Sequence, residues 1–291
     1  MTRTSTGKPM QHARVFSKGG SYQEIVDSDM LLHKEVIATA ISSLSNWLKS
    51  DQQPAMLRIL DLACGGLPIV PSALMKAFPD RHFDYCGIDI NSDQIADAKS
   101  HKFSPNVTPR LMQGDSWDPS TWSDCGPFDI VYIGLNIHHA VPEELEYLAQ
   151  QLHTLIRMGG IFINHDFFRP TKYPYLRRPD HDPKTGISLS LISPERLKRA
   201  GYPLPQNPPQ TPDWRENFFK PYIKTMKDRG MPQSMIDMTV QHVSEHDYPV
   251  TTSEWAKILS QHGFSTQEYA YPNSHEPLRD FFDTVVATRI K

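Results

Sequence analysis

The sequence is short of the features that mark several large classes of protein. It has only three cysteines, Cys64, Cys86 and Cys125, and no C-x-x-C pair, so it indicates neither a disulfide framework nor a cysteine zinc site. No apolar run reaches 18 residues, and no apolar leader opens the chain. A formal net charge of −3 gives no basic surface for nucleic acid or an anionic membrane. We therefore expect a cytoplasmic protein with no membrane or nucleic-acid partner.

The dinucleotide-binding pattern G-x-G-x-x-G is also missing, which disfavours a nicotinamide dehydrogenase. In its place, an apolar run over 58–62 stops abruptly in small residues that end at Gly66. A second apolar run ends in Asp89, 23 residues after Gly66. This order of strand, tight turn, helix, strand and carboxylate is typical of an adenosine cofactor site, where the carboxylate accepts hydrogen bonds from ribose hydroxyls. The alternative is an ordinary strand-to-helix turn of an α/β domain.

Apolar strands alternate with helical segments over the first 167 residues. Apolar residues at helical spacing predict one or two helices over 21–50. The strands that we predict next are 57–63, 83–90, 107–112, 128–135 and 159–167, with helices at 69–78, 92–100 and 142–157 between them. Such alternation predicts a parallel sheet covered on both faces, with ligands bound beyond the carboxyl ends of its strands.

The pattern changes after residue 168. Residues 167–250 hold 13 of the 25 prolines, so this stretch does not continue the sheet. We predict helices near 194–200, 213–229 and 232–244, inserted over the strand ends. A stripe on the second of these helices is interpreted as packing rather than as a substrate pocket; it consists of Trp214, Phe218, Tyr222 and Met226. The core pattern returns with a helix at 252–262 and strands at 264–271 and 281–290, which fit an antiparallel hairpin at the sheet edge.

Residues 61–66, Asp-Leu-Ala-Cys-Gly-Gly, resemble the D-L-G-C-G-x-G turn of class I S-adenosylmethionine (SAM) dependent methyltransferases. Four further motifs resemble that family in order and spacing: Gly114-Asp115-Ser116, the F-D-x-V strand at 128–131, Gly134 to His139, and Met158-Gly159-Gly160. The 252–264 segment, which ends in Gly-Phe, resembles the segment before the hairpin in natural-product and quinone methyltransferases. The chain departs from the family at two glycines, where Ala63 and Leu67 stand.

The resemblance implies a Rossmann-like α/β fold, mostly parallel with a C-terminal antiparallel hairpin, N-terminal helices and a helical insertion after strand 5. The expected organisation is an N-terminal helical lid over 1–54, a SAM-binding core over 55–168, an insertion over 169–250 that serves as acceptor lid or dimer interface, and a C-terminal completion of the sheet over 251–291. SAM is the implied cofactor and S-adenosyl-L-homocysteine its product. The implied cofactor contacts are Asp61, Ala63, Cys64, Gly65, Gly66, Asp89, Ile90, Gly114, Asp115, Ser116, Leu135, Asn136 and, on the N-terminal segment, Tyr22.

Methyl transfer to a hydroxyl or amine also needs a proton acceptor, most often His or a carboxylate near the strand ends. The candidates after strands four and five are His138, His139, His165 and Asp166, with Asp166 expected to orient the ring of His139 or His165. The segment Glu245-His246-Asp247 of the insertion could reach over the same pocket, which makes His246 a further candidate. For each histidine the alternative is a capping or packing role.

We expect no metal site, although His138, His139, His165 and Asp166 could supply two histidines and a carboxylate. The family's N/D-P-P-Y/F turn for nucleic-acid bases is absent after strand four, and Asn207-Pro208-Pro209 stands at the wrong place for it. We therefore predict methyl transfer to a small-molecule acceptor, flat or apolar because the insertion is rich in aromatic residues such as Tyr173, Tyr175 and Phe219. Two alternatives remain: a SAM-binding enzyme of this fold with different chemistry, and a non-catalytic SAM-binding or scaffold protein.

Overall fold

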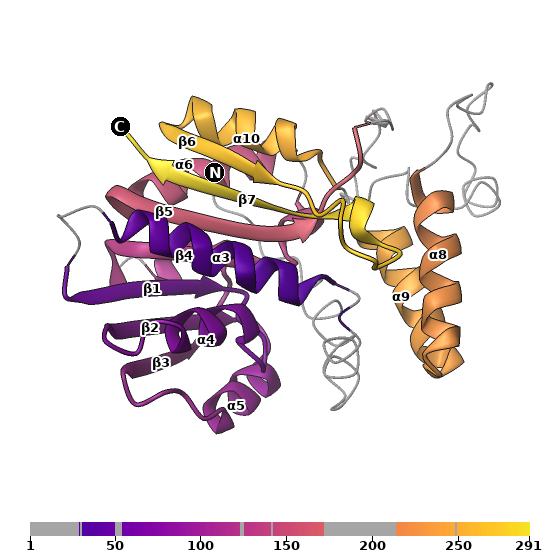
Figure 1. Cartoon of the computed structure of the whole chain (residues 1–291), viewed down its shortest axis with the longest axis horizontal. Coiled ribbons are helices and arrows are strands. Elements are labelled where there is room, and N and C mark those ends of the chain that lie inside the picture. The colour runs from indigo at the N-terminus through magenta and orange to yellow at the C-terminus, as the bar shows by residue number, and fades with distance from the viewer. Residues whose placement is uncertain are drawn as a thin grey trace.

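A single sheet of seven strands organises the computed structural model, which describes residues 29, 31–49, 54–122, 125–140, 142–171, 214–247 and 249–291. The strand order is β3-β2-β1-β4-β5-β7-β6 (Figure 1). The strands are β1 (Met56–Leu62), β2 (His82–Asp89), β3 (Val107–Gln113), β4 (Phe128–Gly134), β5 (Ile156–Phe167), β6 (Phe264–Tyr269) and β7 (Phe282–Arg289).

The first five strands are parallel, and the order of the sheet reverses between β1 and β4. Strand β1 pairs with β2 on one side and with β4 on the other, both in parallel register. The antiparallel strand β7 lies between β5 and β6, so the hairpin closes the sheet. A ligand site of such a sheet lies beyond the carboxyl ends at the reversal point, here the ends of β1 and β4.

Helices cover both faces of the sheet. Apolar residues of α3 (His33–Trp47) and α4 (Ile69–Lys76) pack on one face, and those of α6 (Pro142–Leu155) and α10 (Thr252–Gln261) pack on the other. The short α5 (Ser92–Ser100) begins at Asn91, whose side chain accepts a hydrogen bond from the Asp93 backbone and so caps the helix. Helix α10 begins with a reciprocal capping box between Thr251 and Glu254.

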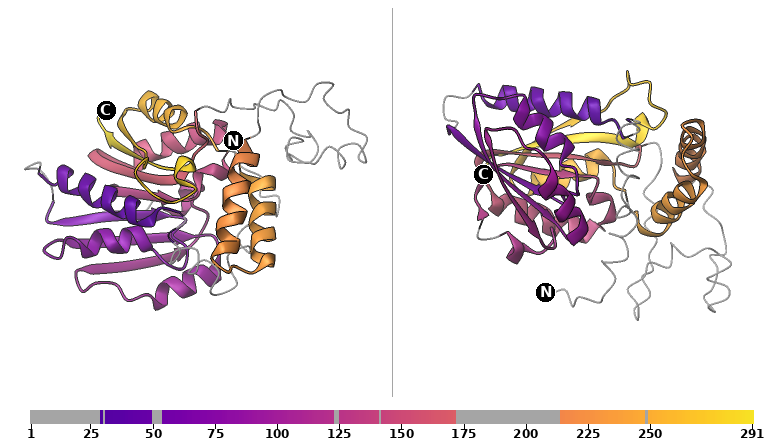
Figure 2. Two further views of the ribbon diagram at one scale, coloured as in Figure 1. Left: turned by 45° about the vertical axis from the view of Figure 1, so that its right-hand side comes forward. Right: turned by 90° about the horizontal axis from the view of Figure 1, so that it is seen from below.

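Two further helices, α8 (Trp214–Asp228) and α9 (Gln233–His246), lie side by side beyond the carboxyl ends of the parallel strands (Figures 1 and 2). Phe218, Tyr222 and Met226 on one face of α8 are buried. They join a cluster that includes Phe167 at the end of β5 and Phe281 just before β7. The stripe therefore packs α8 onto the sheet, as the sequence predicts for these three residues.

The predicted fold class is confirmed, and each predicted strand appears within three residues of its expected ends. Strand β5 begins earlier than predicted, at Ile156, because Ile156 already pairs with Phe128 of β4. The predicted helix at 194–200 and the predicted contact Tyr22 lie outside the described residues, as do Tyr173 and Tyr175. None of the helices that the structure describes is long and apolar enough to span a bilayer.

The packing of α8 leads to a stability prediction for Phe218→Ala. Phe218 stacks on Tyr222 with ring centroids 5.3 Å apart and meets the Phe281 ring edge-on at 5.2 Å. Removing this buried ring should lower the free energy of unfolding by about 3–5 kcal/mol, as measured by urea denaturation. The neighbouring Phe219 is only partly buried and provides the matched control. Phe219→Ala should lower the free energy of unfolding clearly less than Phe218→Ala does. Equal losses from the two variants would contradict the packing role.

Candidate functional site

The turn after β1 brings bare backbone to the reversal point of the sheet. Gly65 adopts a left-handed conformation with φ of +60°, which a glycine tolerates without strain. At Gly66 an added Cβ would lie 2.8 Å from Gln94 Oε1 and 2.9 Å from Asp97 Cβ, so no larger residue fits. Ala63, at the position of a family glycine, also has a left-handed φ of 61°. The substitution therefore keeps a left-handed backbone there, at a strain of about 1–2 kcal/mol.

Asp89, at the end of β2, fastens this turn. One of its carboxylate oxygens accepts a hydrogen bond from the Gly65 backbone N–H at 2.9 Å, and the other accepts one from the Asn91 N–H at 2.9 Å. Burial raises the pKa of Asp89, while these two backbone hydrogen bonds act in the opposite direction. A carboxylate has about four lone-pair positions, so Asp89 retains acceptor capacity for hydroxyl groups.

Behind the turn, Asp61 of β1 is buried beside Tyr85. The Tyr85 hydroxyl donates to Asp61 Oδ2 at 2.6 Å. Burial is the largest influence on Asp61 and raises its pKa to about 7, although the Tyr85 hydrogen bond lowers it. Nearby Asp89 adds to the rise. Asp61 therefore changes charge near neutral pH.

The predicted contacts after β3 lie along the same edge. The Gly114 N–H donates to the Asp89 backbone carbonyl at 2.9 Å, which joins the ends of β2 and β3. Asp115 accepts a hydrogen bond from the Trp117 N–H at 2.9 Å, and the Trp117 indole donates to Asn136 Oδ1 at 3.0 Å. The carboxyl ends of β2, β3 and β4 are thus tied together beside the turn. Ile90 and Ser116 are half-buried in this region.

A cavity of about 40 Å³ lies at the carboxyl ends of β1 and β4. Its walls include Asp61, Ala63 and Leu67 from the turn region, Leu135 after β4, and the rings of His33 and His165. Leu135 has a left-handed φ of 51°, an uncommon conformation for a large side chain. Backbone strain of this kind is typical of functional sites, because the surrounding structure must hold it in place.

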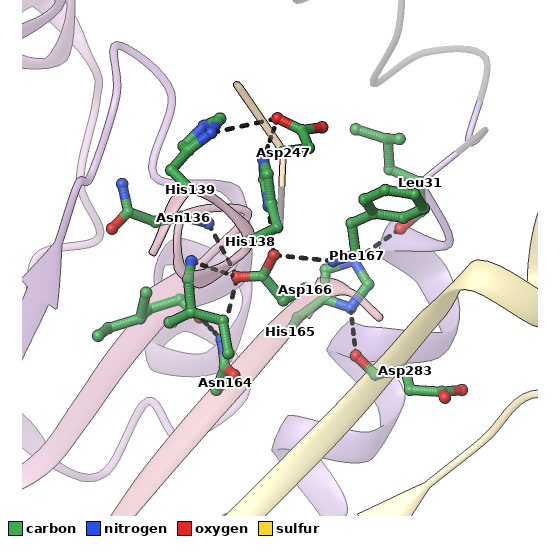
Figure 3. A network of polar contacts seen from close by, with 12 residues as sticks. Leu31, Asn136, His138, His139, Asn164, His165, Asp166, Phe167, Asp247 and Asp283 are labelled. Atoms are coloured by element: carbon green, nitrogen blue, oxygen red, sulfur yellow. Dashed lines mark hydrogen bonds and ion pairs between the residues drawn. The ribbon is translucent and has the colours of Figure 1, made fainter. Parts of the chain in front are cut away.

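Asp166 holds the short helix η3 (Ile137–His139) that follows β4 (Figure 3). Its Oδ2 accepts hydrogen bonds from the backbone N–H groups of Asn136 and Ile137, both at 2.8 Å. Its Oδ1 is in direct contact with Nδ1 of His138. Burial disfavours a charge on His138, but Asp247 and Asp166 outweigh burial and raise the pKa of His138 to about 9.

Asp247, which directly follows α9, faces three imidazole rings. Its Oδ1 lies 3.2 Å from His139 Nδ1, 3.8 Å from His138 Nε2 and 3.7 Å from His242 Nε2. Asp247 is buried, yet these rings hold the pKa of its carboxyl at about 2, against the effect of burial. The rings of His138 and His139 have centroids 4.0 Å apart, and those of His139 and His242 are 5.0 Å apart. We call these four residues the histidine cluster: His138, His139, His242 and Asp247.

His165 lies apart from the histidine cluster and points to the other side of β5 (Figure 3). Its two ring nitrogens face the backbone carbonyls of Asp283 at 3.1 Å and Leu31 at 2.8 Å. Burial lowers the pKa of His165, and a neutral ring can donate to only one of these carbonyls. The imidazole that Asp166 contacts is that of His138.

The structure thus brings His138, His139 and Asp166 together and leaves His165 at the wall of the cavity. The side chain of the candidate His246, the last residue of α9, lies outside the described part of the structure, and the next residue, Asp247, contacts the histidines. Sequence reasoning missed His242 entirely. The H-x-x-x-H spacing of His242 and His246 on α9 was a local signal for it, but the approach of His242 to η3 depends on how α9 packs.

Comparison with known proteins relates the central part of the chain to a known family of domains. Residues 59–160 match a family model described as a methyltransferase domain. No curated protein matches the sequence at a significant level.

Solved structures resemble the chain in fold. The plantazolicin methyltransferase BpumL in complex with S-adenosylhomocysteine (SAH) has a TM-score of 0.56 at 12% identity, over 96% of this chain and 94% of that one. An O-methyltransferase family protein from Burkholderia thailandensis has a TM-score of 0.51 at 12% identity, over 90% of this chain and 57% of that one. The citrinin polyketide synthase CMeT domain gives 0.51 at 13% identity, over 86% and 51%. This chain spans about half the length of several solved structures that it matches.

The buried carboxyl of Asp61 predicts a pH-dependent effect of Asp61→Asn. Because the pKa rises from 3.8 to about 7 on folding, the native state favours the protonated acid. Its contribution to stability is complete below about pH 4 and is lost as the pH rises towards 7, a change of roughly 4 kcal/mol at most. An asparagine stays neutral, so the variant should gain stability relative to the original chain between pH 5 and pH 8 in urea unfolding.

Asp84→Asn is the matched control, because Asp84 is a half-buried acid on β2 that pairs with Arg58 at 3.5 Å. It should show no such gain at high pH. A stability difference for Asp61→Asn that is the same at pH 5 and pH 8 would contradict the assignment.

Proposed function

We propose that the chain, whose residues 59–160 match a methyltransferase domain, is a SAM-dependent enzyme that methylates a small-molecule acceptor, at oxygen in preference to nitrogen or carbon. The observation that carries the proposal is the position of the His139–Asp247 pair. This pair stands just beyond the carboxyl end of β4, beside the cofactor turn and the point where the sheet order reverses. A proton acceptor is needed there when the acceptor group is a hydroxyl.

The residues present fit SAM as the cofactor. Gly65 and Gly66 keep the turn free of side chains, and Gly66 has no room for one. Asp89 has acceptor capacity left for two hydroxyl groups, and Asp115 offers a second carboxylate one strand away. A cavity lined by Ala63 and Leu135 adjoins the turn. A pyrophosphate cofactor is disfavoured, because Leu67 and Pro68 stand where the turn would need further bare backbone.

When bound, SAM would supply an electrophilic methyl group for transfer to the acceptor oxygen. The protein has to hold the acceptor in line and in a dry environment, and positioning of this kind contributes roughly 7–11 kcal/mol. His139 is suited to take the hydroxyl proton, because its side chain is 32% exposed while that of His138 is only 9% exposed. Asp247 stabilises the charge that His139 acquires. Asp166 positions both histidines through its hydrogen bonds to η3.

The helices α8 and α9 belong to the acceptor side of the site in this proposal. They lie beyond the strand ends, and α9 supplies His242 while Asp247 directly follows it (Figure 2). The segment 169–250 thus serves as a cover over the acceptor, and residues 55–168 serve as the cofactor core. The aromatic residues of α8 that the structure describes as buried are engaged in packing, so they give no support to a flat acceptor. The proposed acceptor is therefore described only as a small molecule that carries a hydroxyl group.

Calorimetric titration tests the cofactor assignment. The purified chain should bind SAM and SAH but not NAD, and Asp89→Ala should weaken both sulfur ligands at least tenfold, since a hydrogen bond to a charged group contributes about 1.5–3 kcal/mol. Asp93→Ala, an exposed acid on the adjoining helix, is the control and should bind normally. Binding of NAD in place of SAM would refute the proposal.

Kinetics of His139→Ala test the chemistry. With an acceptor found in a screen of hydroxylated small molecules, kcat should fall about 10²–10⁴-fold, while the calorimetric SAM affinity stays unchanged. The control is His262→Ala, which removes a histidine that pairs with Glu146 on the far side of the sheet core. If His139→Ala turned over at the original rate, the histidine would have no part in proton removal.

A further inference from the structure

The histidine cluster draws its members from two segments that are distant in sequence. His138 and His139 come from η3 after β4, whereas His242 belongs to α9 and Asp247 follows that helix. One potential ligand atom from each of the four residues lies within 4.8 Å of all the others. His138, His242 and Asp247 are buried, and His139 is half-buried. Three imidazoles and one carboxylate are a typical ligand set for zinc and related transition metals.

Asp247 Oδ1 and the three nearby ring nitrogens are spaced like the ligand atoms of a single metal ion. This buried oxygen accepts no hydrogen bond within the described part of the chain, although three ring nitrogens lie 3.2 to 3.8 Å away. Ligands bound tetrahedrally at about 2.0–2.1 Å from a zinc ion are separated from one another by roughly 3.4 Å. The three separations fall around this value, and because all four ligand atoms lie within 4.8 Å of one another, no pair has to close by more than about 1.4 Å.

His138 is oriented as a metal-binding histidine would be. Asp166 accepts backbone N–H hydrogen bonds from Asn136, Ile137 and Phe167, so its carboxylate acts as an acceptor and the His138 Nδ1 must donate to it. The opposite ring nitrogen, Nε2, then points towards Asp247. A carboxylate that fixes one nitrogen of a histidine while the other binds the ion is the usual outer-shell arrangement of metal sites.

We propose that His138, His139, His242 and Asp247 form a binding site for a divalent transition metal of the zinc type. The buried carboxylates of Asp166 and Asp247 lie beside the ring nitrogens, which favours a cation at the centre of the cluster. Four protein ligands make a closed site, which is typical of structural rather than catalytic zinc. A bound ion would therefore fasten α9 to η3.

This site goes beyond the proposed methyl transfer and does not depend on it. Coordination through His139 Nδ1 leaves the proton on Nε2, so the same ring cannot also accept the proton of an acceptor hydroxyl. Zinc binding should accordingly slow methyl transfer, and chelation should restore it. A failure to bind zinc would leave the role of His139 as a base intact, and the two proposals can be judged separately.

Metal titration of the full chain in the absence of SAM and acceptor tests the site. After removal of metal by chelation, the protein should take up one equivalent of Zn²⁺ with a rise in thermal midpoint. Substitution by Co²⁺ should produce the visible absorption of a tetrahedral site. Asp247→Asn and His242→Ala should each weaken Zn²⁺ more than about 100-fold, beyond the range expected for an outer-shell partner. His262→Ala, outside the cluster, should bind Zn²⁺ as the original chain does.

Folding of the variants is checked by their far-ultraviolet circular dichroism and by SAM titration, and His242→Gln replaces His242→Ala if the latter unfolds. Two outcomes would overturn the proposal. One is the absence of stoichiometric Zn²⁺ binding, which would mean that the cluster is balanced by protons on its rings. The other is equal Zn²⁺ binding by the His242 variants and His262→Ala, which would place the ion on surface histidines.

Discussion

The candidate site depends most on the carboxylate of Asp166. This fully buried group accepts backbone hydrogen bonds from Asn136 and Ile137, across the boundary between β4 and β5, and from the adjacent Phe167. It also contacts His138, and these donors together lower its pKa in spite of burial. An ionised carboxylate in such a position is stable only with its donors in place. It therefore fixes the start of η3, and the positions of His138 and His139 follow from it.

The second half of the histidine cluster is placed by apolar packing. Helix α8 is anchored through Phe218 and Tyr222 to the ends of β5 and β7, and α9 packs in the same cluster through Ile236 and Val243. His242 precedes Val243 directly, so the packing of α9 also sets the approach of its imidazole. The burial of apolar residues on α9 thus positions the imidazole of His242, because packed interiors allow only small displacements. The hydrogen bonds to Asp166 and the burial of Ile137 in the core hold the η3 half, and apolar contacts set the α9 half.

The sequence was enough to predict the sheet and the tight turn after β1, because local sequence patterns encode both features. Each parallel strand is a short apolar run, and the acid at Asp89 follows its strand directly, so strand periodicity locates both. The departure at Ala63 was harder to judge from residues alone. The structure shows that alanine there adopts the left-handed backbone that glycine would adopt freely. A change of residue type therefore does not mean a change of turn.

The histidine cluster could not be predicted in full, since its halves meet only in the folded chain. One part of it was nevertheless accessible to simple reasoning. His165 and Asp166 are consecutive residues of a strand, and consecutive side chains point to opposite faces of a sheet, so the two could not serve one pocket. That rule assigns Asp166 to the η3 side and His165 to the side of Leu31, as found. No comparable rule links His242 or Asp247 to η3, because the approach is fixed by the packing of α8 and α9.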